Sequence, residues 1–157
     1  MKTINKLENG RAAYAYQCAE EGKTIYKPDE RKGENQIDGI YYKDDKYKSY
    51  VKNIPMLIKT NGLGATLAFI NSKGVKKIKN GKNPGEKENP KNAYDLVYHQ
   101  LTEWFKKEEN PMSFKVEELV KDLCEMDSQQ YRAMTKETLA FFNWLRRFAE
   151  GLIEGDE

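Results

Sequence analysis

The chain has 157 residues, 38% of them hydrophobic and 33% charged, which is ordinary for a helical protein with one domain and a real core. No run approaches the roughly 18 apolar residues of a membrane-spanning helix, and the polar start MKTINKLENGR lacks a signal peptide's apolar core, so we expect a cytoplasmic protein. The net charge of +2 hides an asymmetry: residues 43–91 carry twelve lysines and four acidic residues, and residues 92–157 carry eight basic and fourteen acidic ones.

The N-terminal part of the chain predicts one helix followed by a long loop. Apolar and small side chains share one helical face from about Thr3 to Glu21, and Gly22 supplies an end signal. Residues 23–41 combine dense charge with one proline and two glycines. They predict a flexible loop that contains at most a short extended piece.

The stretch YKSYVKNIPMLIKTNGLGATLAFI, residues 47–70, predicts two helices. In the first, apolar residues recur at spacings of three, one, three, three and one, which defines one helical face: Tyr47, Tyr50, Val51, Ile54, Leu57 and Ile58. Pro55 lies inside this pattern and predicts a kink near Lys52. Helical spacing then resumes at Leu63.

A polar and glycine-containing joint separates these two helices. Asn61 can cap a helix through its side-chain oxygen, Gly62 tolerates backbone angles that other residues resist, and Gly64 lets another backbone come close. We interpret the three residues as a structural joint. The alternative is an approach to phosphate at a helix start.

The segment 71–92 is the most basic of the chain, with seven lysines, three glycines and two prolines. Its few apolar residues, Val75 and Ile78, cannot offset the entropy cost of ordering it. We therefore expect a second flexible loop, which is mobile in the free protein.

Helical signals dominate the C-terminal part. We expect a helix from Pro90 to Asn110, a short helix capped by Ser113, a turn from Asp127 to Tyr131, and a last helix from about Lys136 to Leu152. No segment alternates convincingly like a strand. The predicted fold class is all-α: one domain over residues 1–157, formed by a compact bundle of about six helices with a long basic loop.

The sequence offers no credible catalytic, metal or cofactor site. His99 is the only histidine, so one chain has neither a two-histidine acid–base pair nor a histidine-rich metal site. The glycine-containing segments lack the GK[ST] ending of a phosphate-binding loop. Cys18 and Cys124 each fall on an apolar helical face and are predicted to be buried, inert thiols.

Three segments carry a family resemblance: RAAYAYQCAEE at residues 11–21, YKSYVKNIP and TNGLGATLAF within residues 47–69, and ETLAFFNWLRRFAEGLIEG at residues 137–155. In this order the chain resembles the small subunit of the type III-B CRISPR effector, the Cmr complex. The resemblance implies a non-catalytic helical protein that stacks with further copies of itself inside a ribonucleoprotein. Its implied partners are the guide RNA, the target RNA, and the backbone and large subunits of the effector.

The resemblance and the basic middle of the chain together indicate RNA-backbone contact by side chains that lie off the apolar faces. The candidates are Lys46, Lys48, Lys52 and Lys59 on the first of the two helices, Lys76, Lys77 and Lys79 in the basic loop, and Arg146 and Arg147 on the last helix. For the two arginines, phosphate contact and an intrachain ion pair are equally plausible. For Arg11, the favoured interpretation is a buried ion pair.

Other interpretations stay open. A helical protein–protein adaptor would use the basic surface to meet an acidic partner without RNA, and a ribonuclease would use His99 with nearby lysines. Aromatic residues can stack on bases, but most of them fall on apolar faces, which favours core packing for Tyr14, Tyr47, Tyr50, Trp104 and Trp144.

Overall fold

A computed structural model of the chain describes residues 2–26, 36–37, 40–41, 46–73, 93–108, 110, 112 and 115–153. Six helices lie within these ranges: α1 (Lys2–Tyr26), α2 (Tyr47–Asn61), α3 (Leu63–Lys73), α4 (Ala93–Lys106), α5 (Leu119–Cys124) and α6 (Ser128–Leu152). The two-residue strands β1 (Gln36–Ile37) and β2 (Ile40–Tyr41) pair antiparallel. The predicted all-α class is confirmed, and the short extended piece falls inside the segment 23–41.

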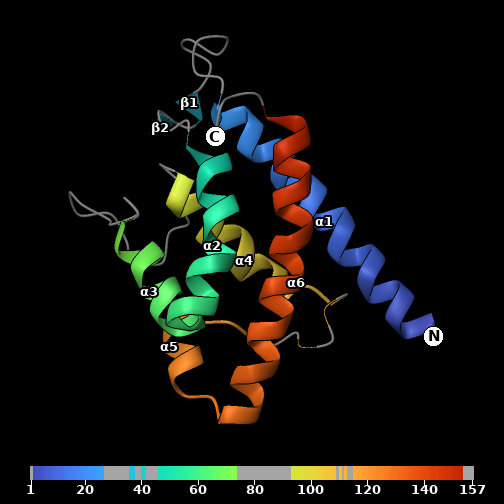
Figure 1. Cartoon of the computed structure of the whole chain (residues 1–157), viewed down its shortest axis with the longest axis vertical. Helices are drawn as coiled ribbons and strands as arrows, with labels where there is room; N and C mark the ends of the chain where they lie inside the picture. Colours follow the sequence, from blue (N-terminus) through green and yellow to red (C-terminus); the bar gives the residue numbers. More distant parts are fainter. Residues whose placement is uncertain are drawn as a thin grey trace.

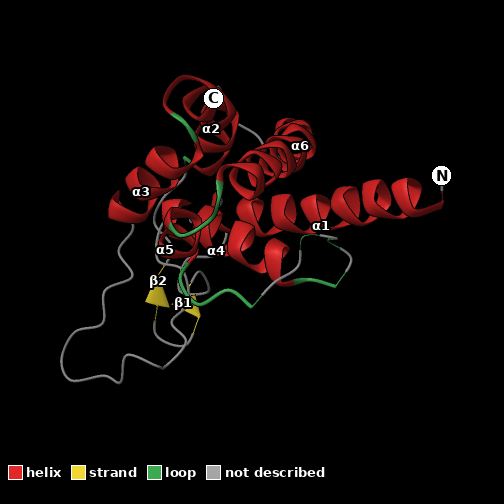
Figure 2. Ribbon diagram, turned by 90° about the horizontal axis from the view of Figure 1, so that it is seen from below, coloured by secondary structure: helices red, strands yellow, loops and turns green. Residues whose placement is uncertain are grey.

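The two longest helices, α1 and α6, form the most extensive helix pair. On its other side α6 packs against α2, and α3 and α4 pack on each other and on α2 (Figure 1). Figure 2 shows the same order from below, with α3 and α1 on opposite sides of the bundle. The bundle therefore has two different outer faces, one formed by α1 with α6 and one formed by α2, α3 and α4.

Aromatic side chains fill the centre of the bundle. Trp104 from α4 and Phe141 from α6 are fully buried, and Tyr14 from α1 stacks on both with ring centroids 5.7 Å away. Burial of one such side chain stabilises a fold by about 1.5–3 kcal/mol. On α2 the predicted apolar face is the buried one, with Tyr47, Val51, Ile54 and Ile58 inside and Tyr50 and Leu57 at its edge.

Several predicted boundaries are wrong. The turn after Asp127 and the last helix are one helix, α6, which begins at Ser128; the Asp127 carboxylate accepts a hydrogen bond from the Gln130 amide at 2.8 Å. The first helix does not stop at Gly22 but continues to Tyr26. Helix α5 begins only at Leu119, where the Glu118 side chain is the N-terminal cap.

Other predictions fall on residues outside the described ranges, namely Pro90, Ser113 and most of the two loops. The segment 71–92 overlaps the description only at residues 71–73, which belong to α3. Among the described residues, no helix combines the length and apolar character needed to cross a bilayer.

The two cysteines differ, contrary to the prediction that both are buried. Cys18 on α1 is 1% exposed, and burial raises the pKa of its thiol. Cys124 is exposed, because it follows the buried Leu123 at the end of the short α5 and so points away from the core. Position on an apolar face is a poor guide to burial at a helix end.

This difference predicts the reactivity of the two thiols. In the native protein, an aromatic disulfide reagent should titrate one thiol, Cys124, and the second should react only after denaturant is added, because the thiolate is the nucleophile. In Cys124→Ser, the fast phase should disappear. Two fast equivalents from the wild-type chain would contradict the burial of Cys18.

Candidate nucleic-acid interface

Three of the candidate lysines lie along one edge of α2. Lys48, Lys52 and Lys59 are separated by four and seven residues, and these spacings bring side chains to the same side of an α-helix. Lys48 Nζ donates to the Ile153 carbonyl at 3.3 Å, and Lys52 Nζ lies 3.9 Å from the Glu150 carboxylate. The edge therefore borders the C-terminal end of α6, which runs antiparallel to α2 (Figure 1).

The two candidate arginines have different positions on α6. Arg146 precedes Glu150 by one turn and so lies on the side that faces α2, and its Nε is buried with no hydrogen-bond partner among the described residues. Arg147 is exposed. Lys48, Lys52, Lys59, Arg146 and Arg147 are called the basic edge below.

The structure does not bring all candidates together. Lys46 is exposed and precedes α2, and the spacing of two residues to Lys48 places it on another side of the helix. Lys76, Lys77 and Lys79 lie outside the described residues. The ion pair between Lys52 and Glu150 involves side chains 37% and 42% exposed, so it is an exposed contact that contributes little to stability.

Of the three joint residues, only Gly62 lies between α2 and α3: Asn61 is the last residue of α2, and does not cap the second helix as expected, and Gly64 is in the first turn of α3. Gly62 has a φ of 94°, its N–H donates to the Ile58 carbonyl at 2.8 Å, and its own carbonyl accepts from the Thr66 amide at 3.2 Å. The Gly64 amide donates to the Tyr131 hydroxyl of α6 at 2.6 Å. The group that approaches Gly64 is thus the Tyr131 side chain, and not another backbone as expected. Its hydroxyl already accepts the hydrogen bond of an amide that a bound phosphate would need.

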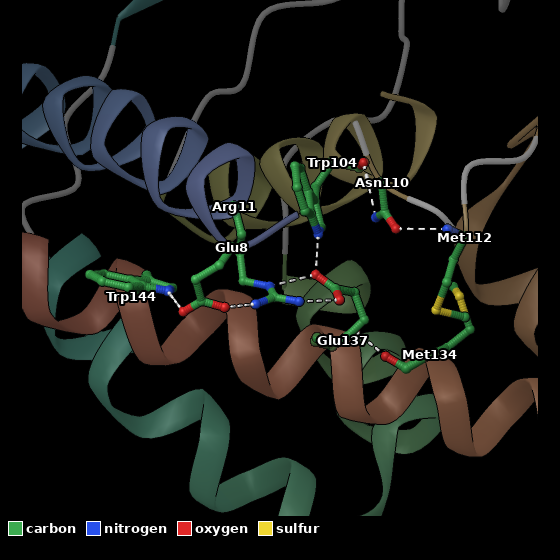
Figure 3. A network of polar contacts seen from close by, with 9 residues as sticks. Glu8, Arg11, Trp104, Asn110, Met112, Met134, Glu137 and Trp144 are labelled. Atoms are coloured by element: carbon green, nitrogen blue, oxygen red, sulfur yellow. Dashed lines mark hydrogen bonds and ion pairs between the residues drawn. The ribbon is translucent and has the colours of Figure 1, made fainter. Parts of the chain in front are cut away.

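Arg11 lies in a buried network that ties α1, α4 and α6 together (Figure 3). Its Nε and Nη2 donate to the two oxygens of Glu137 at 2.8 and 2.7 Å, and Trp104 Nε1 donates to the same carboxylate at 2.9 Å. Glu8 accepts from Arg11 and from Trp144 Nε1. The hydrogen bonds to Glu137 raise the pKa of Arg11, so this cation is engaged within the fold.

The titratable groups with shifted pKa values are structural. Burial raises the pKa of the Tyr47, Tyr14 and Cys18 side chains, which keeps all three protonated at neutral pH. Tyr47 uses its proton to donate to the Gln100 side-chain oxygen at 2.6 Å. In the described part of the chain, no three histidine, cysteine or acidic side chains are grouped to hold a metal ion.

An apolar groove lies on the other side of α2, between α2, α3 and α4. It has a volume of about 410 Å³ and is lined mainly by Tyr50, Ile54, Met56, Leu57, Phe69 and Tyr94. Met56 is 70% exposed and Phe69 43% exposed, and both are large hydrophobic side chains. The sequence interpretation missed this groove, although Met56 stands off the apolar face of its helix and had no assigned contact.

Comparisons with known proteins agree on one family. Residues 7–152 match the family described as CRISPR-associated protein (Cas_Cmr5). The CRISPR system Cmr subunit Cmr5 of Thermus thermophilus is 27% identical over 109 residues, which cover 69% of this chain and 75% of that protein. A crystal structure of a CRISPR-associated Cmr5 family protein from Thermus thermophilus matches with a TM-score of 0.54 and 24% identity, covering 92% of this chain and 97% of the other; this likeness concerns the fold.

Proposed function

The chain belongs to the Cmr5 family of CRISPR-associated proteins, the small subunits of the type III-B Cmr complex, and from that premise we propose that it binds RNA backbone without cleaving it. In this proposal it stacks with further copies of itself and contacts the duplex of guide and target RNA. It takes part in antiviral defence as a structural subunit. The large and backbone subunits of the effector are its protein partners.

The basic edge is the observation that carries this proposal. Lys48 and Lys59 are eleven residues apart on α2, or about 16 Å along the helix axis, and one nucleic-acid strand presents several phosphates over such a length. Arginine grips a phosphate with two donors, and lysine contributes a point charge. Such contacts bind the nucleic-acid backbone without sequence specificity. This is sufficient where the target is recognised by base pairing.

Replacing the three edge lysines tests the proposal. In the assembled Cmr complex, Lys48→Gln/Lys52→Gln/Lys59→Gln should weaken target-RNA binding, most strongly at low salt. Each lost phosphate contact lowers the magnitude of the slope of log Kobs against log[salt] by about 0.7–0.9, so three contacts lower it by about 2–3 for each copy engaged. The measurement is a salt-titrated binding isotherm, read together with the mass of the assembled complex.

The matched control removes the same charge elsewhere. Lys106→Gln/Lys115→Gln/Lys121→Gln changes three exposed lysines on α4, on α5 and in the segment before α5, none of which lies on the two helices of the basic edge. Its salt slope should equal that of the wild-type complex. If the edge variant assembles normally and keeps the wild-type slope, RNA contact through α2 is wrong and the adaptor alternative is favoured.

A further inference from the structure

An acidic side chain, Glu150 of α6, lies among the cations of the basic edge. Its carboxylate is 3.9 Å from Lys52 Nζ of α2. Glu150 also follows Arg146 by one helical turn, so the two side chains are neighbours on the same side of α6. A negative charge therefore borders two of the side chains that the proposed function assigns to RNA backbone.

The stability of the fold does not account for this ion pair. The side chains of Lys52 and Glu150 are 37% and 42% exposed, and an exposed pair contributes little to stability. Their distance of 3.9 Å is also longer than a hydrogen bond, so the attraction between them is electrostatic only. Lys48 differs, because its Nζ donates a hydrogen bond to the part-buried Ile153 carbonyl. The contact between Lys52 and Glu150 is thus the one on this edge that a competing anion can replace most easily.

A phosphate group would compete with Glu150 for Lys52. Both groups are anions with oxygen acceptors, and a lysine donates to phosphate in a charge-assisted hydrogen bond of about 2.7–2.9 Å, which is shorter than the present contact. An RNA strand also brings further phosphates to Lys48 and Lys59 on the same helix, whereas Glu150 is a single carboxylate. The strand therefore has the stronger combined attraction for this edge.

Arg146 gives the carboxylate a second cation to balance. The Arg146 Nε is buried and has no hydrogen-bond partner among the described residues, and a buried polar group of a cation is costly without nearby negative charge. Glu150 supplies such a charge one helical turn away. In the absence of RNA, the carboxylate thus offsets the positive charge of Arg146 and Lys52, which is the electrostatic role that a phosphate has in the complex.

We propose that the Glu150 carboxylate occupies the place of an RNA phosphate beside Lys52 and is displaced when RNA binds. The inference rests on the proposed function and adds a residue that lowers the affinity of the basic edge for anions. The consequence is selectivity. A ligand with a single phosphate must displace Glu150 for one contact, whereas an RNA backbone offsets the same loss by contacts with several cations.

Glu150→Gln tests the competition, because it removes the charge and keeps the shape of the side chain. In the assembled Cmr complex, the variant should bind target RNA more tightly than wild type at low salt. The expected gain is about 1.4- to 5-fold for each copy that contacts RNA, which corresponds to the strength of exposed ion pairs. The gain should decrease as salt rises, because exposed charges are screened. Binding isotherms at several salt concentrations measure it, and unchanged thermal melting of the variant subunit verifies the fold.

Two comparisons separate local competition from a general effect of charge. Glu125→Gln is the matched control, because Glu125 is an exposed glutamate at the C-terminal end of α5, on neither helix of the basic edge. Its gain in affinity should be smaller than that of Glu150→Gln. In the Lys52→Gln background, Glu150→Gln should also give a smaller gain, because the lysine for which the carboxylate competes is absent. Equal gains for both glutamates, or in both backgrounds, would overturn the proposal.

The RNA role of the edge and the competition by Glu150 fail separately in this design. If Lys48→Gln/Lys52→Gln/Lys59→Gln keeps the wild-type salt slope, RNA contact through α2 is wrong. If that variant lowers the magnitude of the slope but Glu150→Gln leaves RNA affinity unchanged, the RNA contact stands and the competition is wrong. Weaker binding by Glu150→Gln would show that the carboxylate holds Lys52 in position for RNA, which is the opposite of the proposed role.

Discussion

Glu137→Gln should lower the free energy of unfolding by about 3–5 kcal/mol, which is the usual cost of removing one partner from a buried ion pair. Glu137 is 7% exposed and accepts three hydrogen bonds, two from Arg11 and one from Trp104. Glutamine has the same shape as glutamate, so the substitution creates no cavity that would add to the loss of stability. The loss comes from leaving the guanidinium of Arg11, 8% exposed, without its buried carboxylate, so that only the half-exposed Glu8 still pairs with it.

Chemical and thermal unfolding measure this effect. At about 2–4 °C per kcal/mol for a protein of this size, the midpoint should fall by roughly 6–20 °C. Glu8→Gln is the control, because its side chain is 49% exposed and water can replace its contact with Arg11; it should cost less than about 1 kcal/mol.

A double variant separates the ion pair from general damage to the core. Arg11→Met/Glu137→Leu replaces both charges with apolar groups, so no buried charge is left alone, and much of the lost stability should return. A Glu137→Gln protein within about 1 kcal/mol of wild type would show that Arg11 reaches water or another carboxylate, and that the network does not hold α1 on α6.

Helix positions follow well from the sequence, because apolar spacing decides which side of a helix is buried. The buried face of α2 is predicted by that spacing alone. Boundaries are less reliable, as the continuous α6 illustrates. The sequence prediction separates its first two turns from the rest, although Met134 and Phe141 are seven residues apart and both are buried on one side of the helix. Local capping at Asp127 is visible in the sequence, but the length of the helix depends on packing against α1 and α2.

The candidate interface is only partly accessible to sequence reasoning. Lysines off the apolar face can be identified, but not the neighbours of each, because Lys48 and Ile153 are 105 residues apart in the chain. For the same reason, the sequence does not reveal that Glu137 pairs with Arg11, which is 126 residues away in the chain. Contacts between distant helices depend on how the helices are aligned side by side, and no local pattern records that alignment.

At Gly22, helix propensity alone predicts the wrong sign for the effect of an alanine substitution. A second large effect on stability is expected here. A glycine inside a helix normally destabilises it by about 0.5–1 kcal/mol relative to alanine, so Gly→Ala is normally favourable. Here a Cβ would lie 2.2 Å from the Cδ1 and Cε1 atoms of Tyr47. Glycine at this site therefore allows α1 and α2 to approach each other, and does not end the helix.

The Tyr47 ring has little freedom to move away. It is fully buried, and its hydroxyl donates to Gln100 Oε1 at 2.6 Å and lies 3.2 Å from the Cys18 carbonyl. Overpacking of this kind costs about 1–3 kcal/mol, and it outweighs the gain in helix propensity. Gly22→Ala should therefore be less stable than wild type by about 1–3 kcal/mol in urea unfolding.

Gly151→Ala is the matched control, because a Cβ there meets no atom within 4 Å. Gly151 lies in the last turn of α6, so alanine should leave stability unchanged or raise it by up to about 1 kcal/mol. The two identical substitutions are thus expected to have opposite or clearly unequal effects. Equal stabilisation of both would mean that α1 and α2 do not approach each other closely at Gly22.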